Sequence, residues 1–232
     1  MTDKLLFINE NISYMFRRNI VEYDMQSASL AVSERFNLMS STLIEQLRNT
    51  PKAERVKKVG LMQRDDKAFS DAMLQGIIST RQEFLDINHI TEDEILCLHS
   101  DAIVFDMNQT DIIDHVDNVN FVRKGQWSSY ILYRGVEMYY NDGVIDFKGI
   151  PKDILKMHTL GLVQYLVKIF EYLEACDDSV VSYMKKFQKR YFSDKLPIYY
   201  YTSFPRVGTH KMENLNLFSF LTRVISSDMR SW

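Results

Sequence analysis

Two aspartates that end short apolar stretches are the strongest candidates for chemistry in this chain. Asp24 follows the run Ile20-Val21-Glu22-Tyr23. Asp101 lies between the apolar runs Leu96-Cys97-Leu98 and Ala102-Ile103-Val104-Phe105. Carboxylate oxygens are the protein ligands that Mg²⁺ prefers, and two such ions together catalyse phosphoryl transfer. Two carboxylates delivered to one place would therefore form a Mg²⁺ (or Mn²⁺) site.

The elements that flank the two aspartates have to position them. Residues 19–23 alternate apolar and polar types and predict a strand, and helical spacing begins a few residues after Asp24. Residues 96–105 predict a tight β-hairpin with Asp101 at its tip. Glu22 shares a strand face with Asp24 because side chains alternate along a strand. It is a candidate third metal ligand.

The remaining pattern predicts an α+β fold with an antiparallel sheet. A short helix is expected over 41–49, and a long helix from Pro51 to about Asn88, with a bend at Gly60 or Gly76. Further short strands are expected over 119–122, 129–133, 136–140 and 144–147. Helices are expected from Lys152 through Leu173, over 179–190 and over 214–229.

Composition limits the function classes. The chain has 232 residues, of which 46% are hydrophobic, so it can bury a core. It contains no apolar run of about 20 residues and no signal-peptide pattern, and its two cysteines read as reduced thiols; these features predict a cytoplasmic protein without a membrane partner. Residues 1–150 carry 16 Lys and Arg against 23 Asp and Glu, whereas residues 151–232 carry 12 against 8. Any binding of nucleic acid by positive charge must therefore involve a local cluster of basic residues.

The order of these motifs resembles the palm and fingers of phage-type family B DNA polymerases. Asp24-Met25-Gln26-Ser27 is similar to the family's first carboxylate motif, and His99-Ser100-Asp101-Ala102 is similar to its Asp-Thr-Asp-Ser hairpin. Phe147-Lys148-Gly149-Ile150, after a hairpin with Trp127-Ser128-Ser129-Tyr130, looks like its Lys-Gly and basic-Tyr elements. The chain departs from the family at His99, which replaces a carboxylate, and it lacks the Asn-Ser-x-Tyr-Gly motif.

The resemblance implies a palm-like domain over residues 1–150, with a fingers-like helical insertion at about 40–90, and a helical thumb-like region over residues 151–232. It implies a nucleotidyltransferase in which Asp24 and Asp101 hold two Mg²⁺ ions about 3.5–4 Å apart. The expected partners are DNA or RNA, nucleoside triphosphates and a larger phage protein complex, in an infected bacterial cell.

Cations of the expected long helix would bind the triphosphate. Arg64 is the first choice, followed by Lys57 and Lys58, and Arg64 shares a helix face with Lys57. Backbone N–H groups at Gln26 and Ser27 would also approach phosphate at a helix start. The predicted nucleic-acid contacts are Lys148, Lys185, Lys186, Lys189 and Arg190.

Two other functions fit the same residues. A palm-like fold that has lost catalysis would act as an interaction or assembly subunit of a phage nucleic-acid complex, and His99 favours this hypothesis. A metal-dependent nuclease would use Glu22 as a third ligand. Each motif also has an ordinary structural explanation: Asp24 as a helix cap, Asp101 as a turn residue, and the lysine runs as solvated helix faces.

Overall fold

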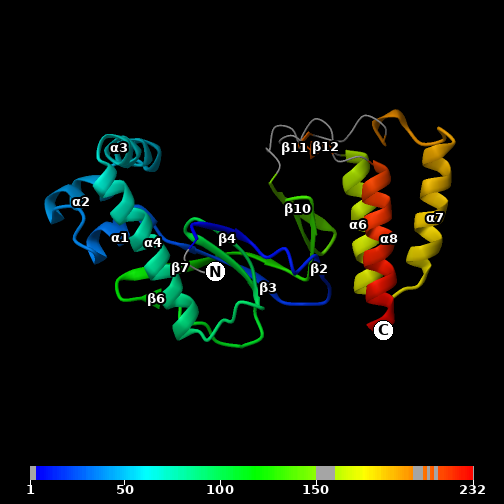
Figure 1. The fold of residues 1–232 in the computed structure, drawn as a ribbon, viewed down its shortest axis with the longest axis horizontal. Coiled ribbons are helices and arrows are strands. Elements are labelled where there is room, and N and C mark those ends of the chain that lie inside the picture. The colour runs from blue at the N-terminus through cyan, green and yellow to red at the C-terminus, as the bar shows by residue number, and fades with distance from the viewer. Residues whose placement is uncertain (1–3, 150–159, 201–205, 208–209, 212–213, 232) are drawn as a thin grey trace. The chain divides into compact units, whose positions relative to one another are not determined.

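The computed structural model of the chain describes residues 4–149, 160–200, 206–207, 210–211 and 214–231 (Figure 1). It divides into two compact units. Unit 1 contains residues 1–9 and 20–126, and unit 2 contains residues 10–19 and 127–232. This division differs from the expected boundary at residue 150, because the strands after residue 127 form a sheet of their own that packs with the C-terminal helices.

Unit 1 is built on a sheet with the strand order β1-β4-β5-β3-β7-β6. The pairs β1–β4, β4–β5, β3–β5 and β6–β7 are antiparallel. The strands are β1 (Leu6–Ile8), β3 (Ile20–Met25), β4 (Ile95–His99), β5 (Ala102–Asp106), β6 (His115–Val116) and β7 (Val119–Trp127). The predicted hairpin is confirmed, since β4 and β5 are joined by a turn at Ser100 and Asp101.

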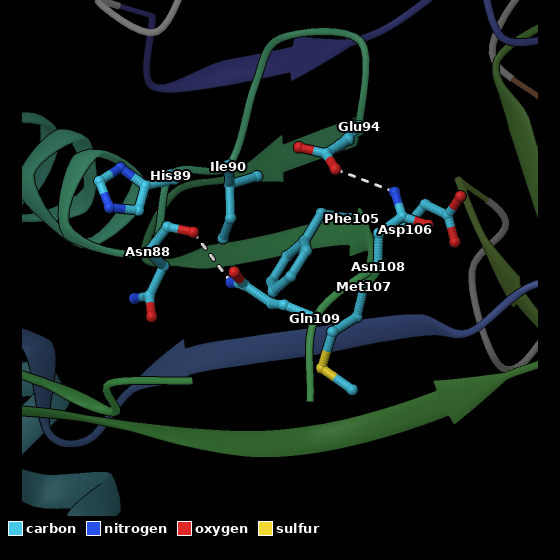
Figure 2. Close-up of a pocket in the computed structure, with 9 residues that line it drawn as sticks. All are labelled: Asn88, His89, Ile90, Glu94, Phe105, Asp106, Met107, Asn108 and Gln109. Atoms are coloured by element: carbon cyan, nitrogen blue, oxygen red, sulfur yellow. Dashed lines mark hydrogen bonds between the residues drawn. The ribbon is translucent and has the colours of Figure 1, made fainter. Parts of the chain in front are cut away.

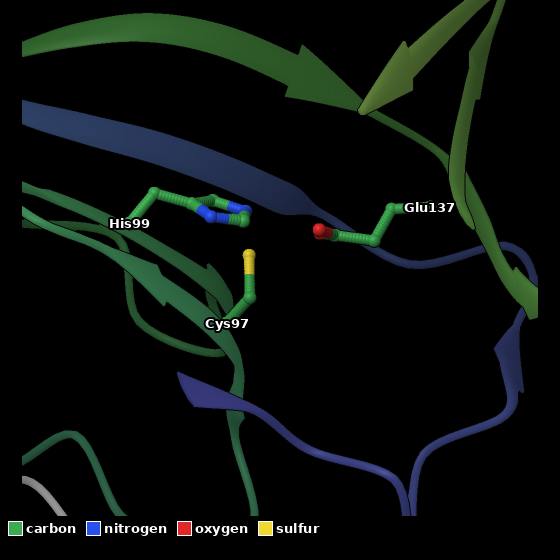
Figure 3. Close-up of side chains that lie close together, drawn as sticks. All are labelled: Cys97, His99 and Glu137. Carbon is green, nitrogen blue, oxygen red and sulfur yellow. The ribbon is translucent and has the colours of Figure 1, made fainter. Parts of the chain in front are cut away.

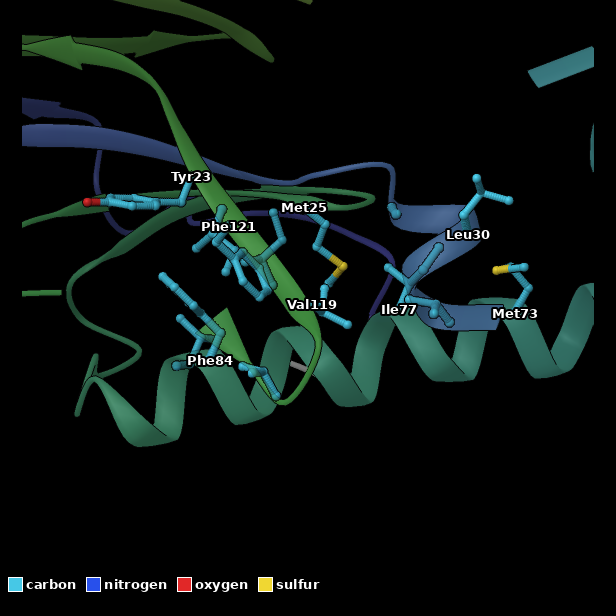
Figure 4. Packing of buried hydrophobic residues seen from close by; sticks show 14 of the residues in the cluster. Tyr23, Met25, Leu30, Met73, Ile77, Phe84, Val119 and Phe121 are labelled. Carbon is cyan, nitrogen blue, oxygen red and sulfur yellow. The ribbon is translucent and has the colours of Figure 1, made fainter. Parts of the chain in front are cut away.

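Four helices lie between β3 and β4 in the sequence, and the last three fall within residues 40–90, where the fingers-like insertion was expected. They are α1 (Ala28–Arg35), α2 (Ser41–Arg48), α3 (Lys52–Asp65) and α4 (Lys67–Ile87). The apolar residues Tyr23 and Met25 of β3 pack with Phe84 of α4 and Phe121 of β7 in one buried cluster (Figure 4). The Phe84 and Phe121 rings stack with centroids 4.1 Å apart. One face of the sheet is thereby fixed against α4.

The long helix expected from Pro51 to Asn88 is divided in two at Asp66. Asp66 leaves helical geometry, with φ −127° and ψ 103°, and its side chain accepts a 3.0 Å hydrogen bond from the N–H of Phe69. It is therefore the N-cap of α4. The expected bend at Gly60 or Gly76 was wrong because both glycines lie within regular helix.

Unit 2 contains a second sheet with the order β10-β9-β8-β2. Its strands are β2 (Tyr14–Met15), β8 (Ser129–Tyr133), β9 (Val136–Asn141) and β10 (Val144–Lys148), and the pairs β2–β8, β8–β9 and β9–β10 are antiparallel. The apolar side chains of Ile131, Met138 and Tyr140 join one core with residues of the helices. The N-terminal segment is held to this unit by Arg17, which donates 3.1 and 3.0 Å hydrogen bonds to the Asp228 carboxylate.

The C-terminal elements of unit 2 are mostly helical. They are α6 (Leu160–Glu174), α7 (Ser179–Phe192), η1 (Ile198–Tyr200), β11 (Arg206–Val207), β12 (His210–Lys211), α8 (Asn214–Asp228) and η2 (Met229–Ser231). The residues from Lys152 to 159, where a helix was expected, lie outside the described part of the chain. Among the helices that the structure describes, none has the length and apolar character needed to cross a membrane. The α+β prediction is confirmed.

Candidate functional site

The two predicted aspartates of unit 1, Asp24 and Asp101, lie next to each other. Asp24 pairs with Ala102 across the β3–β5 ladder, which sets it beside the turn that carries Asp101. The backbone N–H of Met25 donates a 3.1 Å hydrogen bond to the carbonyl of Asp101. The negative charge of the Asp101 carboxylate also acts on the Asp24 carboxyl, so the two side chains are close neighbours. The strands therefore bring together two carboxylates that are far apart in the sequence.

The surroundings of Asp24 raise the pKa of its carboxyl above the ordinary value. Partial burial is the largest cause, and the negative charge of Asp101 is the next. Glu22 also raises this pKa, whereas the positive charge of Lys124 lowers it. Negative charge is thus concentrated at a half-buried point, where both burial and repulsion disfavour it. A divalent cation with oxygen ligands would relieve this repulsion, so the donor set fits Mg²⁺ or Mn²⁺.

The third predicted ligand, Glu22, shares the face of β3 that carries Asp24. The residue between them, Tyr23, points to the opposite face, where its ring lies 5.7 Å from Phe84 and 5.9 Å from Phe105. This alternation keeps Tyr23 in the core beneath the aspartates. Glu22 acts on Asp24 through its charge and does not line the cleft described below.

The histidine of the hairpin, His99, lies in the same row of the sheet as Asp24. Both residues pair with Ala102, one from each side, so two strand spacings of about 4.8 Å separate their backbones. Figure 3 shows the side chains of His99 and Cys97 on the same side of β4, as expected two residues apart. Glu137, also drawn there, belongs to unit 2.

A cleft of about 510 Å³ opens over the carboxylate pair within unit 1. Its polar wall includes Asp24, Asp101 and Lys124, and α3 adds Lys52 and Arg55. An apolar wall completes the lining and comprises Ala28, Val56, Met73, Leu74 and Ile77. A cleft with carboxylates, cations and an apolar wall suits a small anionic ligand that also has an apolar part.

The cations predicted for triphosphate binding lie elsewhere on α3. Arg64 bonds to the carboxylate of Asp65 at 2.7 Å, and Lys58 pairs with Glu54 at 2.9 Å, both at exposed positions. Lys57 is also exposed, and none of the three lines the cleft. The physical reason is helix geometry. The cleft-facing residues Lys52, Arg55, Val56 and Gln63 share one face, and Lys57 and Arg64 share a different one.

Gln26 and Ser27, whose backbone N–H groups were predicted to approach phosphate, both line the cleft, but one of these N–H groups is already used. The N–H of Gln26 donates a 2.8 Å hydrogen bond to the carbonyl of Asn120, so it does not point at a ligand. Ser27 adopts a left-handed conformation with φ 54°, and its side chain makes no capping hydrogen bond to α1.

Sequence reasoning missed Lys124, Lys52 and Arg55. Lys124 lies on β7, on the strand face of Asn120 and Val122 and opposite the buried Val119 and Phe121. The alternation of buried and exposed side chains along residues 119–127 could have assigned Lys124 to this face. The proximity of Lys124 to Asp24 follows from the placement of β7 beside β3, which no local pattern encodes.

The predicted nucleic-acid contacts all lie in unit 2. The Lys148 ammonium lies over the Trp127 and Tyr139 rings, 5.7 and 5.4 Å from their centroids. The indole N–H of Trp127 donates a 2.9 Å hydrogen bond to Asp146. Lys148 is therefore held by cation–π contacts at a half-buried position. The four basic residues of α7, Lys185, Lys186, Lys189 and Arg190, are all exposed.

A second, smaller pocket of about 130 Å³ lies at the other end of the sheet of unit 1 (Figure 2). Its polar groups bond to one another. Gln109 donates a 2.9 Å hydrogen bond to the carbonyl of Asn88, and Asn108 donates one of 2.9 Å to Glu94. Burial alone would raise the pKa of Glu94, but hydrogen bonds from Thr91 and Asn108 lower it overall. This pocket therefore serves to fix the loop after β5.

Comparison with known proteins identifies one protein family. The family model described as "Bacteriophage PBS1 gene 130 protein" matches residues 1–232, so the chain belongs to this phage family. This confirms the expected phage origin. No curated protein matches the chain.

Proposed function

We propose that this member of the bacteriophage PBS1 gene 130 family is a nucleotidyltransferase that uses Mg²⁺ held by Asp24 and Asp101. The observation that carries the proposal is the adjacent pair of carboxyl groups in a cleft that also contains cations. A half-buried carboxyl pair is costly for stability, and such strain concentrates at functional sites. The resemblance to family B polymerases supports the same chemistry.

The residues of the cleft have separate roles in this proposal. Asp24 and Asp101 would hold the metal, which when bound activates an attacking hydroxyl and neutralises phosphate charge. Arg55 and Lys52 would bind the triphosphate oxygens, and Lys124 would balance the negative charge beside Asp24. The apolar wall with Val56 and Ile77 would accept the base and exclude water from the phosphates.

A nucleotide-incorporation assay tests the proposal. The full chain is incubated with Mg²⁺ or Mn²⁺, nucleoside triphosphates, and primed DNA, primed RNA or unprimed strands. We expect Asp24→Asn and Asp101→Asn each to reduce incorporation by about 100-fold or more, as loss of a main charge-stabilising group does. Asp71→Asn, an exposed position on α4, is the matched control and should keep full activity. Absence of incorporation by the unaltered chain on every substrate would refute the enzymatic claim.

A second candidate is a catalytically inactive assembly subunit, and His99 is the observation that favours it. Strand β4 places His99 in the same row of the sheet as Asp24, so this position carries an imidazole where a polymerase hairpin would carry a further carboxylate. Calorimetric titration with Mg²⁺ and Mn²⁺ separates the two functions. Metal binding that is lost in Asp24→Asn supports the enzyme, and no binding supports the subunit. Shortened strands in the incorporation assay would instead indicate a nuclease that uses Glu22.

A further inference from the structure

We propose that the outer face of α7 in unit 2 binds single-stranded nucleic acid, with Phe192 as a stacking platform for a base. This inference deepens the nucleic-acid partner of the proposed function, but it requires neither metal nor catalysis. Its evidence lies in the charge, the exposure and the helix faces of α7.

The charge of α7 is entirely positive. Between Ser179 and Phe192 the helix carries Lys185, Lys186, Lys189 and Arg190 and no acidic residue. The four cations occupy about 7.5 Å of the helix axis. No ion pair joins the three lysines to a carboxylate within the described part of unit 2. The Arg190 guanidinium donates a 3.4 Å hydrogen bond to the carbonyl of Lys195, which is also exposed.

The apolar face of α7 is already used by the core. Val180 and Met184 are buried, and Tyr183, Phe187 and Tyr191 pack against the same cluster as α6 and α8. At 100° per residue, these side chains lie opposite Lys185 and Lys189. A helix that binds a membrane surface inserts its apolar face into the lipid. Because this face is covered, an anionic membrane is a poor partner for α7.

Phe192 distinguishes this surface from an ordinary solvated helix face. Phe192, the last residue of α7, is 58% exposed, whereas the other aromatic residues of the helix are half-buried. It lies three residues after Lys189 and seven after Lys185, so it borders the row of cations. An exposed aromatic ring beside a row of cations is the arrangement that stacks bases and tracks a phosphate backbone.

A single strand fits these features better than a duplex. A base can stack on Phe192 only if it is free of its own neighbours, which is true of unpaired strands. The row of cations is also short compared with the many phosphate contacts that hold a duplex-binding protein. An acidic protein segment would contact the cations but would gain nothing specific from the aromatic ring.

Fluorescence anisotropy with labelled oligothymidylate of about 20 nucleotides tests the inference. The binding is measured in EDTA, without nucleotides, and with a blunt duplex of the same length as competitor. We expect the unaltered chain to prefer the single strand. Phe192→Ala and Phe192→Leu should each weaken binding by about 5- to 150-fold, and Phe192→Trp should retain it, since stacking needs an aromatic face.

The charged residues are tested by the salt dependence of the same binding. Lys185→Gln with Lys189→Gln should weaken binding and reduce the slope of log K against log salt by about 1.4, at about 0.7 per phosphate contact. Lys67→Gln with Lys168→Gln removes the same charge from exposed positions elsewhere and should leave the slope unchanged. Circular dichroism should show every variant folded, because each changed side chain is exposed.

Any of four outcomes would overturn the inference. The first two are that the chain does not bind the single strand at low salt, or that it binds strand and duplex equally well. The other two are that Phe192→Ala leaves binding unchanged, or that the chain binds only phosphatidylserine vesicles. The proposed function fails separately. Asp24→Asn should leave oligothymidylate binding intact, so a chain that binds strands but never incorporates nucleotides would refute the enzyme and retain the α7 surface.

Discussion

The guanidinium of Arg81 donates a 2.7 Å hydrogen bond to the backbone carbonyl of Ser100, the residue before Asp101. Arg81 comes from α4 and is fully buried. It also donates to the carbonyls of Leu5, at 3.1 Å, and Lys4. Burial lowers its pKa to about 10, while the charge of Asp101 opposes that change, so Arg81 stays positive at neutral pH. One buried cation thus ties the turn that carries Asp101 to α4.

Replacing Arg81 by Met should destabilise the fold strongly. Three backbone carbonyls would lose their donor inside the protein, and we expect a loss of about 3–5 kcal/mol in the free energy of unfolding. Arg81→Lys keeps the charge but reaches fewer carbonyls, so its loss should be smaller. Arg48→Met, which breaks a surface pair with Glu34, should cost at most about 1 kcal/mol. Urea unfolding measures all three, and equal losses for Arg81→Met and Arg48→Met would contradict this role.

Asp24 should make stability decrease as pH rises. A carboxyl whose pKa is higher in the folded chain than its ordinary value of 3.8 binds more protons when folded. Its protonated form is therefore favoured at acid pH, and stability is lost as pH rises through the folded pKa. Asp24→Asn removes this loss. The variant should exceed the unaltered chain in unfolding free energy at about pH 7 and converge with it at about pH 3.

Asp24→Asn also tests whether the pair of Asp24 and Asp101 binds a metal ion or is only an unfavourable pair of carboxyl groups. Mg²⁺ should raise the melting temperature of the unaltered chain, because a ligand that binds only the folded state stabilises it. Mg²⁺ should leave the melting temperature of Asp24→Asn unchanged. Asp71→Asn, on the exposed side of α4, should respond to pH and Mg²⁺ like the unaltered chain. A melting temperature insensitive to Mg²⁺ in every variant would argue against a cation at Asp24.

Local sequence patterns predicted the elements of this chain well. Alternating residues located β3 and the strands β8 to β10, and turn residues located the hairpin that carries Asp101. The division of the long helix at Asp66 was missed because glycine was taken as the weak point. An aspartate three residues before Phe69 is itself a helix-start signal, and it outweighs a glycine inside a helix.

The composition of the cleft could be predicted only in part. Asp24 and Asp101 were found because each follows a short apolar stretch, and the antiparallel pairing of Asp24 with Ala102 brings them together. The predicted cations lie on a face of α3 that does not line the cleft, since the sequence shows that Lys57 and Arg64 share a face but not which face turns inward. That choice depends on the packing of Val59, the buried residue of α3, against unit 1.

The two faces of α3 can be compared by substitution. In the incorporation assay, Arg55→Gln should raise the KM for nucleoside triphosphate by about tenfold or more, because it removes a charge-assisted contact to phosphate. Lys57→Gln removes a charge from the outer face of the same helix and should leave KM unchanged. If Lys57→Gln raises KM and Arg55→Gln does not, the cleft is not the triphosphate site.

Gly76 and Gly60 provide a matched test of the packing that shapes the cleft. A Cβ at Gly76 would lie 2.5 Å from Cγ1 of Val32 and 3.1 Å from the ring of Phe36, so α1 and α4 would have to separate. We expect Gly76→Ala to cost about 1–3 kcal/mol, in spite of alanine's higher helix propensity. At Gly60 a Cβ meets nothing within 4 Å, and Gly60→Ala should stabilise the chain by about 0.5–1 kcal/mol. Thermal and urea unfolding measure both changes, and a stabilising Gly76→Ala would show that α1 and α4 do not pack as closely as described.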